Sequence, residues 1–290
     1  MIPLGREFFK MSGSGNDFVF IDARKEPPGP LASPEVIDAI CRRGTGIGAD
    51  GIVFLEDSEH ADVRLVYLNA DGTRADLCGN ATLCTARLSR ELGIVTGAKE
   101  FTIETDVAVL KARFKADRPE IDLQPLSEVR QDAGIDLEQG ERRMGFALAG
   151  VPHLVIVVDD LEAVDVVGRG RPLRRHASLQ AGANVNFVKP AGDGTFAYRT
   201  YERGVEAETL ACGTGAVATA VLLNDWGLAS GRVRIRTRSG RELEVRLSGP
   251  TESRTPSLSG EARLVYRGQF GEVPGASTSG REMSTAAQSR

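Results

Sequence analysis

Short runs of apolar residues, many of them β-branched or aromatic, recur along the whole chain between turns rich in glycine, proline, asparagine and aspartate. Runs of roughly four to eight such residues between turn signals are typical of β-strands. A helix is expected over 33–43, where Ser-Pro-Glu has the order of an N-cap followed by a proline in the first turn. The expected strands cover residues 18–21, 52–55, 63–68, 101–104, 108–114, 154–158, 185–188, 196–201, 233–236, 243–247 and 262–266.

Two further helices are predicted where the chain repeats one phrase. The segments 78–88 and 212–222 both begin Cys-Gly, and Cys, Gly, Thr, Ala and Leu recur in them at identical offsets. Asn or Thr follows the Cys-Gly pair, and then comes an apolar stretch rich in alanine. The phrase therefore places Cys78 and Cys212 at the starts of two equivalent helices.

The duplication extends beyond the cysteine phrases. Asn69 and Arg203 each lie nine residues before the cysteine of their half, and each follows an expected strand. Asn-Asp-Phe-Val at 16–19 and Asn-Phe-Val at 186–188 add a second match. A repeat of this length indicates two similar domains related by a pseudo-two-fold axis, because solenoid repeats are far shorter.

The composition shift at 116–119, Ala-Asp-Arg-Pro, predicts a domain boundary near residue 122. Each lobe then contains one cysteine phrase, and a serine-, alanine- and glycine-rich tail is expected to be disordered. The expected limits are 1–122 for the N-terminal lobe, completed by about 267–274, then 123–266 for the C-terminal lobe and 275–290 for the tail.

Composition narrows the class of protein. The formal net charge of −4 argues against a nucleic-acid-binding face, and four cysteines in 290 residues are too few for a disulfide scaffold. Residues 1–10 lack the apolar stretch of a signal peptide, and the longest aliphatic run, 154–158, is far too short to span a bilayer. We therefore expect a cytoplasmic protein with reduced thiols that binds neither nucleic acid nor a membrane.

The position of Cys78 and Cys212 favours chemistry over packing. Unpaired backbone N–H groups and the positive end of the dipole stabilise anions at a helix N-terminus, so they lower thiol pKa values and can bind a carboxylate. If two such ends face each other, one thiolate can remove the α-proton of a bound amino acid while the opposite thiol delivers another. Such a reaction inverts the stereocentre. Cys41 and Cys84, in contrast, are expected to be buried small hydrophobes.

Other chemistries fit the sequence less well. The three histidines lie far apart in the chain, and no compact Cys/His cluster indicates zinc. Cys78 and Cys84 are six residues apart, which is not a redox spacing. We therefore expect neither a metal nor a cofactor.

Residues 208–216 read Glu-Thr-Leu-Ala-Cys-Gly-Thr-Gly-Ala. This motif, the most specific of several, resembles the diaminopimelate epimerase family of cofactor-independent, two-cysteine enzymes. The resemblance implies an α+β fold of two pseudo-symmetric lobes, each a curled, mostly antiparallel sheet around a central helix. The other matching stretches are 11–18, 46–51, 69–72, 77–80, 152–153, 184–187 and 201–205.

The resemblance also implies a reaction and a set of site residues. The reaction is conversion of LL-diaminopimelate to meso-diaminopimelate, for lysine and cell-wall precursor biosynthesis, with this small amino acid as the partner and a homodimer left open. Cys78 and Cys212 would be the acid/base pair, with His153 and Glu202 tuning the thiols. The implied substrate-binding residues are Asn16, Asn69, Gly79, Asn80, Asn184, Glu202, Arg203, Gly213 and Thr214.

Departures from the family pattern keep alternatives open. Ala81 and Leu83 stand where the family usually has glycine and arginine, and Val151 replaces an asparagine that contacts substrate. A site that loses a polar contact loses discrimination for the group it held. One alternative is therefore a racemase for another amino acid, such as histidine. Another is a non-catalytic thiol redox sensor on the same fold.

Overall fold

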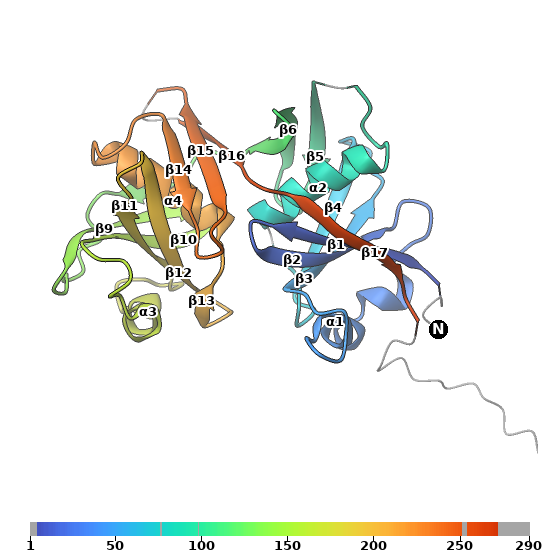
Figure 1. Ribbon diagram of the computed structural model, residues 1–290, viewed down its shortest axis with the longest axis horizontal. Helices are drawn as coiled ribbons and strands as arrows, with labels where there is room; N and C mark the ends of the chain where they lie inside the picture. Colours follow the sequence, from blue (N-terminus) through green and yellow to red (C-terminus); the bar gives the residue numbers. More distant parts are fainter. Residues whose placement is uncertain (1–4, 76, 98, 251–253, 272–290) are drawn as a thin grey trace, which may run out of the picture.

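The protein, here a computed structural model, is described over residues 5–75, 77–97, 99–250 and 254–271. It consists of two halves side by side, each with strands curled around one central helix (Figure 1). The central helices are α2 (Gly79–Glu91) and α4 (Gly213–Asp225), and both begin directly after the repeated cysteine. The predicted α+β fold class is confirmed. The predicted tail, 275–290, lies outside the described residues.

The N-terminal half is a curled ladder of eight strands. Its pairing order is β17–β1–β2–β3–β4–β5–β6–β7, antiparallel except for β2–β3 and β4–β5. Helix α1 (Pro34–Cys41) connects β2 to β3, and α2 connects β4 to β5. The strands are β1 (Glu7–Gly13), β2 (Asn16–Asp22), β3 (Gly51–Glu56), β4 (Val63–Asn69), β5 (Glu100–Glu104), β6 (Val109–Lys115), β7 (Arg118–Asp122) and β17 (Arg263–Gln269).

The C-terminal half repeats the same ladder. Its order is β8–β9–β10–β11–β12–β14–β15–β16, and the two parallel pairs, β10–β11 and β12–β14, fall at the same places. Helix α3 (Val166–Arg174) occupies the place of α1, and α4 that of α2. The strands are β8 (Val129–Arg130), β9 (Glu141–Ala149), β10 (Val151–Val158), β11 (Asn184–Pro190), β12 (Thr195–Glu202), β13 (Ala207–Thr209), β14 (Arg232–Arg236), β15 (Glu242–Ser248) and β16 (Thr255–Ser259).

This shared ladder corrects two equivalences expected from the sequence. Phe18 pairs with the first residue of β3 and His153 with the first residue of β11, so these two residues correspond. Asn186 on β11 therefore corresponds to Val53 on β3, and not to Asn16. By the same register the counterpart of Asn69 is Glu202, because the loop after β12 is one residue longer than the loop after β4.

The two halves join through β7 and β16. These strands pair antiparallel, with Ile121 opposite Leu258, while β16 also pairs with β15 of its own half. The chain then returns to the N-terminal half, where β17 pairs with β1 from Arg263 onward. This return begins a few residues before the expected position of 267, because β17 starts directly after the crossing. The other predicted lobe limits stay predictions.

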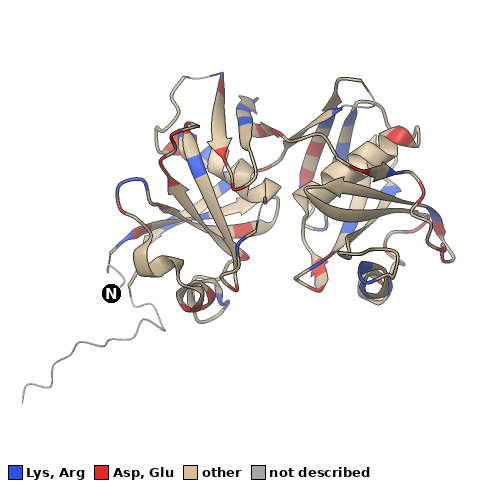
Figure 2. Cartoon of the chain, turned by 180° about the vertical axis from the view of Figure 1, so that it is seen from behind, with Lys and Arg blue, Asp and Glu red and all other residues tan. Residues whose placement is uncertain are grey.

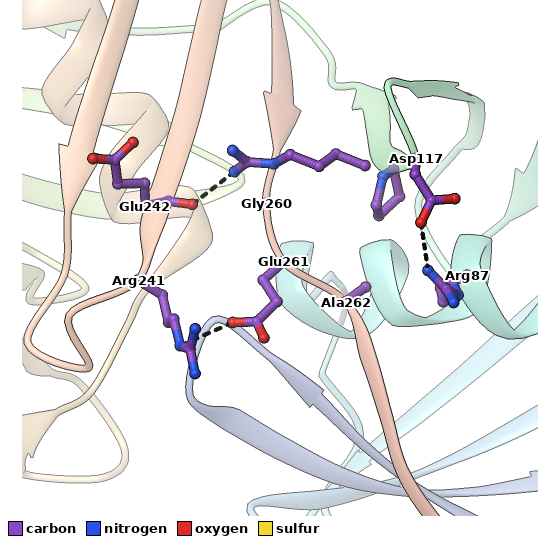
Figure 3. A pocket seen from close by; sticks show the side chains of 9 residues that line it. Arg87, Asp117, Arg241, Glu242, Gly260, Glu261 and Ala262 are labelled. Carbon is purple, nitrogen blue, oxygen red and sulfur yellow. Dashed lines mark hydrogen bonds and ion pairs between the residues drawn. The ribbon is translucent and has the colours of Figure 1, made fainter.

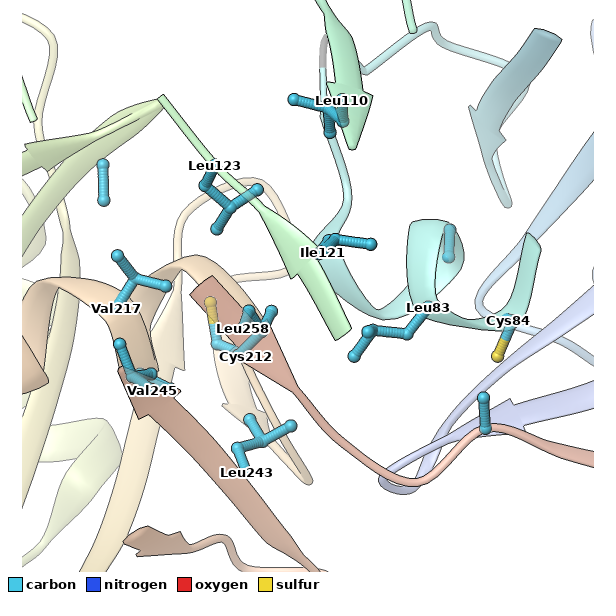
Figure 4. Packing of buried hydrophobic residues seen from close by; sticks show 14 of the residues in the cluster. Leu83, Cys84, Leu110, Ile121, Leu123, Cys212, Val217, Leu243, Val245 and Leu258 are labelled. Atoms are coloured by element: carbon cyan, nitrogen blue, oxygen red, sulfur yellow. The ribbon is translucent and has the colours of Figure 1, made fainter. Parts of the chain in front are cut away.

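One hydrophobic cluster runs through both halves at this joint. Figure 4 shows Leu83 of α2 and Ile121 of β7 close to Leu258 of β16 and Cys212 at the start of α4. In Figure 2 basic and acidic residues are mixed over both halves. The shared core fixes the two central helices relative to each other.

Candidate active site

The N-termini of α2 and α4 meet at the joint between the halves. Cys78 and Cys212 are the N-cap residues, and their backbone angles are almost identical, with φ −127° and ψ 108° in one and φ −128° and ψ 112° in the other. A Cβ added to Gly213 would lie 3.5 Å from the Cα of Gly79. The duplicated phrase therefore places two equivalent thiols at two abutting helix ends, as the sequence predicted.

Leu258 packs against both helix ends and explains why each cysteine is followed by glycine. A Cβ at Gly79 would lie 2.8 Å from the Leu258 Cδ2, and a Cβ at Gly213 would lie 3.2 Å from the same atom. A methyl group at Gly79 would force the Leu258 side chain or the helix end to shift, and one at Gly213 would crowd the same side chain. Leu258 therefore contributes to the spacing between the two helix ends.

A cleft of about 1740 Å³ opens between the halves above these helix ends. Both thiols line it, as do all nine residues that the resemblance implied for substrate binding. His153 does not line the cleft, because it is fully buried behind Thr214. The structure thus gathers the expected binding residues in one place, while their roles stay predictions.

Around Cys78 the polar partner is an acceptor. Asn16 donates from its Nδ2 to the carboxylate of Asp50 at 2.5 Å, and Asp50 is ion-paired with Arg43. Because a carboxylate accepts only, the amide of Asn16 must turn its Oδ1 the other way. That oxygen lies 3.9 Å from the Cys78 Sγ and 3.4 Å from the Nδ2 of Asn80. The Cys78 thiol therefore donates its proton toward Asn16.

Around Cys212 one side-chain partner is a hydroxyl. The Thr214 Oγ1 lies 3.6 Å from the Cys212 Sγ and 3.1 Å from the Nε2 of His153. Burial, together with the positive charge of Arg203, lowers the pKa of His153 to about 3. His153 is therefore a neutral ring at physiological pH, and it contacts Cys212 only through Thr214.

Burial dominates the acidity of both thiols. It raises the pKa of Cys78 to about 12, although the backbone N–H groups of Ala81 and Asn80 lower it in part. Burial also raises the pKa of Cys212, and the negative charge of Glu202 raises it further. Neither side chain meets the geometry of a capping hydrogen bond within these helix ends. The first-turn N–H groups therefore remain available to a bound anion.

Glu202 is a carboxyl group close to both thiols, and its negative charge raises the pKa of each. Burial raises its pKa to about 7, while a hydrogen bond from the Thr209 hydroxyl lowers it in part. A carboxyl group with this pKa exchanges its proton near neutral pH. It can therefore hold a proton that leaves Cys212.

Other predicted binding residues line the same cleft. Arg203 donates from its backbone N–H to the Asn184 Oδ1 at 2.7 Å and from its Nη1 to the Ala181 carbonyl at 3.0 Å. Asn69 donates to the Thr73 hydroxyl at 3.0 Å. These bonds fix the directions of the Asn184, Arg203 and Asn69 side chains. Val151 also lines the cleft.

Sequence reasoning missed four residues that shape the site: Asp50, Asn186, Tyr198 and Leu258. Asp50 and Asn186 lie within the matching motifs, but their contacts are made to residues on other segments of the same half. Leu258 belongs to a strand that the pattern did not predict. Pairing between distant segments, and not local sequence, places these residues at the site.

A second hollow, of about 360 Å³, lies elsewhere along the joint (Figure 3). Its side chains are already paired with each other, for example Arg241 with Glu261 and Arg87 with Asp117. Neither thiol lines it. In the described part of the chain no three His, Cys, Asp or Glu residues gather to suit a metal ion. Nor does any described helix have the length and apolar character needed to cross a membrane.

Solved structures share this architecture. A probable proline racemase from Agrobacterium radiobacter K84 is similar with a TM-score of 0.70 at 20% identity, covering 93% of this chain and 94% of that one. A PhzF-family phenazine biosynthesis protein from Bacillus anthracis has a TM-score of 0.72 at 15% identity, covering 91% and 98%. The architecture is therefore the two-lobed fold of the proline racemase and PhzF structures, here with a cysteine at the start of each central helix.

Within that class the chain belongs to the diaminopimelate epimerase family, whose sequence model it matches over residues 8–125 and 146–265. A relative named diaminopimelate epimerase from Gemmatimonas aurantiaca is 54% identical over 274 residues, covering 91% of this chain and 98% of the relative. One of the same name from Aquifex aeolicus is 37% identical over 277 residues, covering 92% and 98%. The resemblance inferred from the motifs is confirmed, and the protein is an isomerase.

Proposed function

We propose that the protein interconverts LL-diaminopimelate and meso-diaminopimelate, with Cys78 and Cys212 as the acid/base pair. The observation that carries this proposal is the meeting of two thiol-bearing helix ends in one cleft. The names of the relatives supply the substrate.

The abutting helix ends are suited to the carboxylate of the reacting stereocentre. Both first turns direct unpaired N–H groups toward the cleft, and Gly79 and Gly213 allow a ligand close to the backbone. As the α-proton leaves, negative charge develops on this carboxylate. The N–H groups and the two helix dipoles stabilise that charge without rearrangement.

The proton transfer needs one thiolate and one thiol. The thiolate takes the proton from Cα, and the electron pair of the broken C–H bond remains on the substrate. The opposite thiol then gives its proton to the other face of Cα, which inverts the centre. After one turnover the two sulfurs have exchanged protonation states, so the reverse reaction or exchange with solvent restores the first state.

Burial would keep both thiols protonated in the empty site, so substrate must help to form the thiolate. The α-ammonium group of an amino acid brings a positive charge between the sulfurs, which lowers thiol pKa. Glu202, with its pKa near 7, can accept the displaced proton. We place this chemistry in the cytoplasm, because it requires both thiols reduced.

Deuterium exchange tests the proposal directly. With LL-diaminopimelate in heavy water under reducing conditions, we expect deuterium at one Cα together with formation of the meso isomer. Failure to exchange this substrate, with exchange of another amino acid from a panel, would favour the second candidate.

That second candidate is a racemase for an amino acid with a less polar distal group. It is favoured by Val151, an apolar side chain in the lining of the cleft. Chiral chromatography of a panel of free amino acids separates the two candidates. The non-catalytic redox sensor is disfavoured by membership of an isomerase family.

A further inference from the structure

We propose that Asn186 is a positioning residue that fixes His153 as the tautomer with its proton on Nε2, and thereby turns the Thr214 hydroxyl proton toward the Cys212 sulfur. The inference rests on the proposed function, and it assigns a task to residues behind the cleft.

The orientation of the Asn186 amide follows from a backbone group. Its Nδ2 lies 2.7 Å from the carbonyl oxygen of Leu154, which can only accept. The amide nitrogen must therefore face that side, and its oxygen faces the hydroxyls of Tyr198 at 2.7 Å and Thr200 at 3.0 Å. Three partners of the amide are thus assigned, and one N–H remains.

The second N–H of Asn186 then decides the state of His153. It points to the His153 Nδ1 at 3.2 Å, so this ring nitrogen must carry the lone pair. In a neutral ring the proton then resides on Nε2, which lies 3.1 Å from the Thr214 Oγ1. His153 therefore donates to Thr214.

Because the Thr214 oxygen accepts from His153, its own proton is free to point elsewhere. The Cys212 Sγ lies 3.6 Å away. A hydroxyl that donates to sulfur stabilises the thiolate. The hydrogen bonds from Asn186 through His153 and Thr214 therefore stabilise the charged form of Cys212. Glu202 and Tyr198 from β12 and Cys78 from α2 also face this sulfur, and the tests below leave all three unchanged.

The other half of the molecule lacks this chain of bonds. The residues that correspond to His153, Asn186 and Tyr198 by strand register are Phe18, Val53 and Leu65. All three are buried and apolar. The polar chain is therefore a feature of the Cys212 side and not of the fold.

Nitrogen-15 NMR of the histidine rings tests the tautomer in the wild-type protein. The signals of His60 and His176 are identified by substitution of those residues. We expect a protonated Nε2 and a bare Nδ1 for His153, and a protonated Nδ1 would overturn the proposal. This measurement needs no substrate, so it stands apart from the test of the proposed function.

A double-mutant cycle tests the route through Thr214. Asn186→Leu should lower kcat about tenfold or more, since a hydrogen bond to a charged group is lost. In a Thr214→Val background the same substitution should cost little, because the last bond is already absent. Equal losses in both backgrounds would show that Asn186 does not act through Thr214, which would overturn the proposal.

Conservative variants complete the test. Thr214→Ser should retain most of the activity that Thr214→Val loses. His153→Gln should retain more than His153→Leu, because an amide N–H can replace the Nε2 donor. Thr200→Val, which removes a partner of the Asn186 oxygen but not the Leu154 bond, is the control and should leave the tautomer unchanged. If His153→Gln were as inactive as His153→Leu, donation to Thr214 would not be the task of His153.

Discussion

The two halves share one ladder of strands and one helix start, yet they surround their thiols differently. On the N-terminal side Cys78 faces the oxygen of Asn16, an acceptor. On the C-terminal side Cys212 faces the hydroxyl of Thr214. Duplication of the fold thus supplies two equivalent positions for sulfur, and divergence of the surrounding residues gives Cys78 an amide oxygen and Cys212 a hydroxyl as polar partner. In a two-base reaction the two sulfurs hold different protonation states at any moment, and they exchange these states with each turnover.

Removing either sulfur should have the largest effect on activity, and it tests whether both halves contribute a catalytic thiol. Cys78→Ala and Cys212→Ala should each lower epimerisation about a thousandfold or more, because each removes one partner of the proton transfer. Chiral chromatography of the products measures the loss. Cys41→Ala is the control, since Cys41 lies in a separate buried cluster, and it should leave the rate unchanged. A fully active single-alanine variant at either site would contradict the two-thiol mechanism.

A pH scan of stability tests a second difference between the halves, because Glu202 occupies the place of the neutral Asn69. Its folded-state pKa of about 7 lies above the ordinary 4.5, so the folded protein holds this proton more tightly. The free energy of unfolding should therefore fall as pH rises from about 4.5 to about 7, by on the order of 3 kcal/mol.

Denaturant melts across this range measure the fall, and Glu202→Gln should remove most of it. Glu91→Gln, on the exposed side of α2, is the matched control and should keep the wild-type slope. An unchanged slope in Glu202→Gln would mean that Glu202 does not hold a proton near neutral pH.

A third test concerns the spacing of the helix ends. Gly79→Ala should be more harmful than Gly213→Ala, because the added Cβ would lie closer to Leu258. We expect a loss of about tenfold to a hundredfold in kcat/KM and about 1–3 kcal/mol of stability for Gly79→Ala. Leu258→Ala in the Gly79→Ala background should restore part of the activity. Equal effects of the two glycine substitutions would show that Leu258 does not set the spacing.

The smallest effect is expected when the polar partner of Cys78 is replaced by an apolar side chain. Asn16→Val places at position 16 the residue found at the equivalent position, Val151. The Cys78 thiol then loses its acceptor, so its pKa should fall, while kcat/KM should decrease about tenfold. Ultraviolet titration of the thiolate in a Cys212→Ser background measures the pKa. A rise in this pKa would contradict the assignment of the Asn16 oxygen to the sulfur.

Much of the fold could be predicted from local sequence. The paired phrases indicated α2 and α4, and the strands with continuous apolar runs were found. Strand β9 was missed because it begins with three charged residues, and α3 was missed because it contains two glycines and Pro172. Strand β16 has a proline at its second position, which weakens the local signal. Their structure depends on pairing and packing that no local pattern records.

The residues of the site also fall into those that the sequence predicts and those that it does not. The two thiols and their helix ends followed from residue types alone, and the motifs supplied the polar lining. The chain from Tyr198 through Asn186 and His153 could not be predicted, because three strands bring it together. The apparent match between Asn16 and Asn186 was misleading for the same reason, since equivalence here is defined by strand register.

The crossing of β7 and β16 has a mechanical consequence. Leu258, at the middle of this two-stranded joint, touches both helix ends, so an axis through the joint passes close to the two sulfurs. A rotation of one half about that axis would move the outer rim of the cleft over a large distance, because the rim lies far from the axis. The same rotation would displace the two sulfurs little. The opening of the cleft could then widen for an incoming amino acid while the distance between the two sulfurs stays nearly constant.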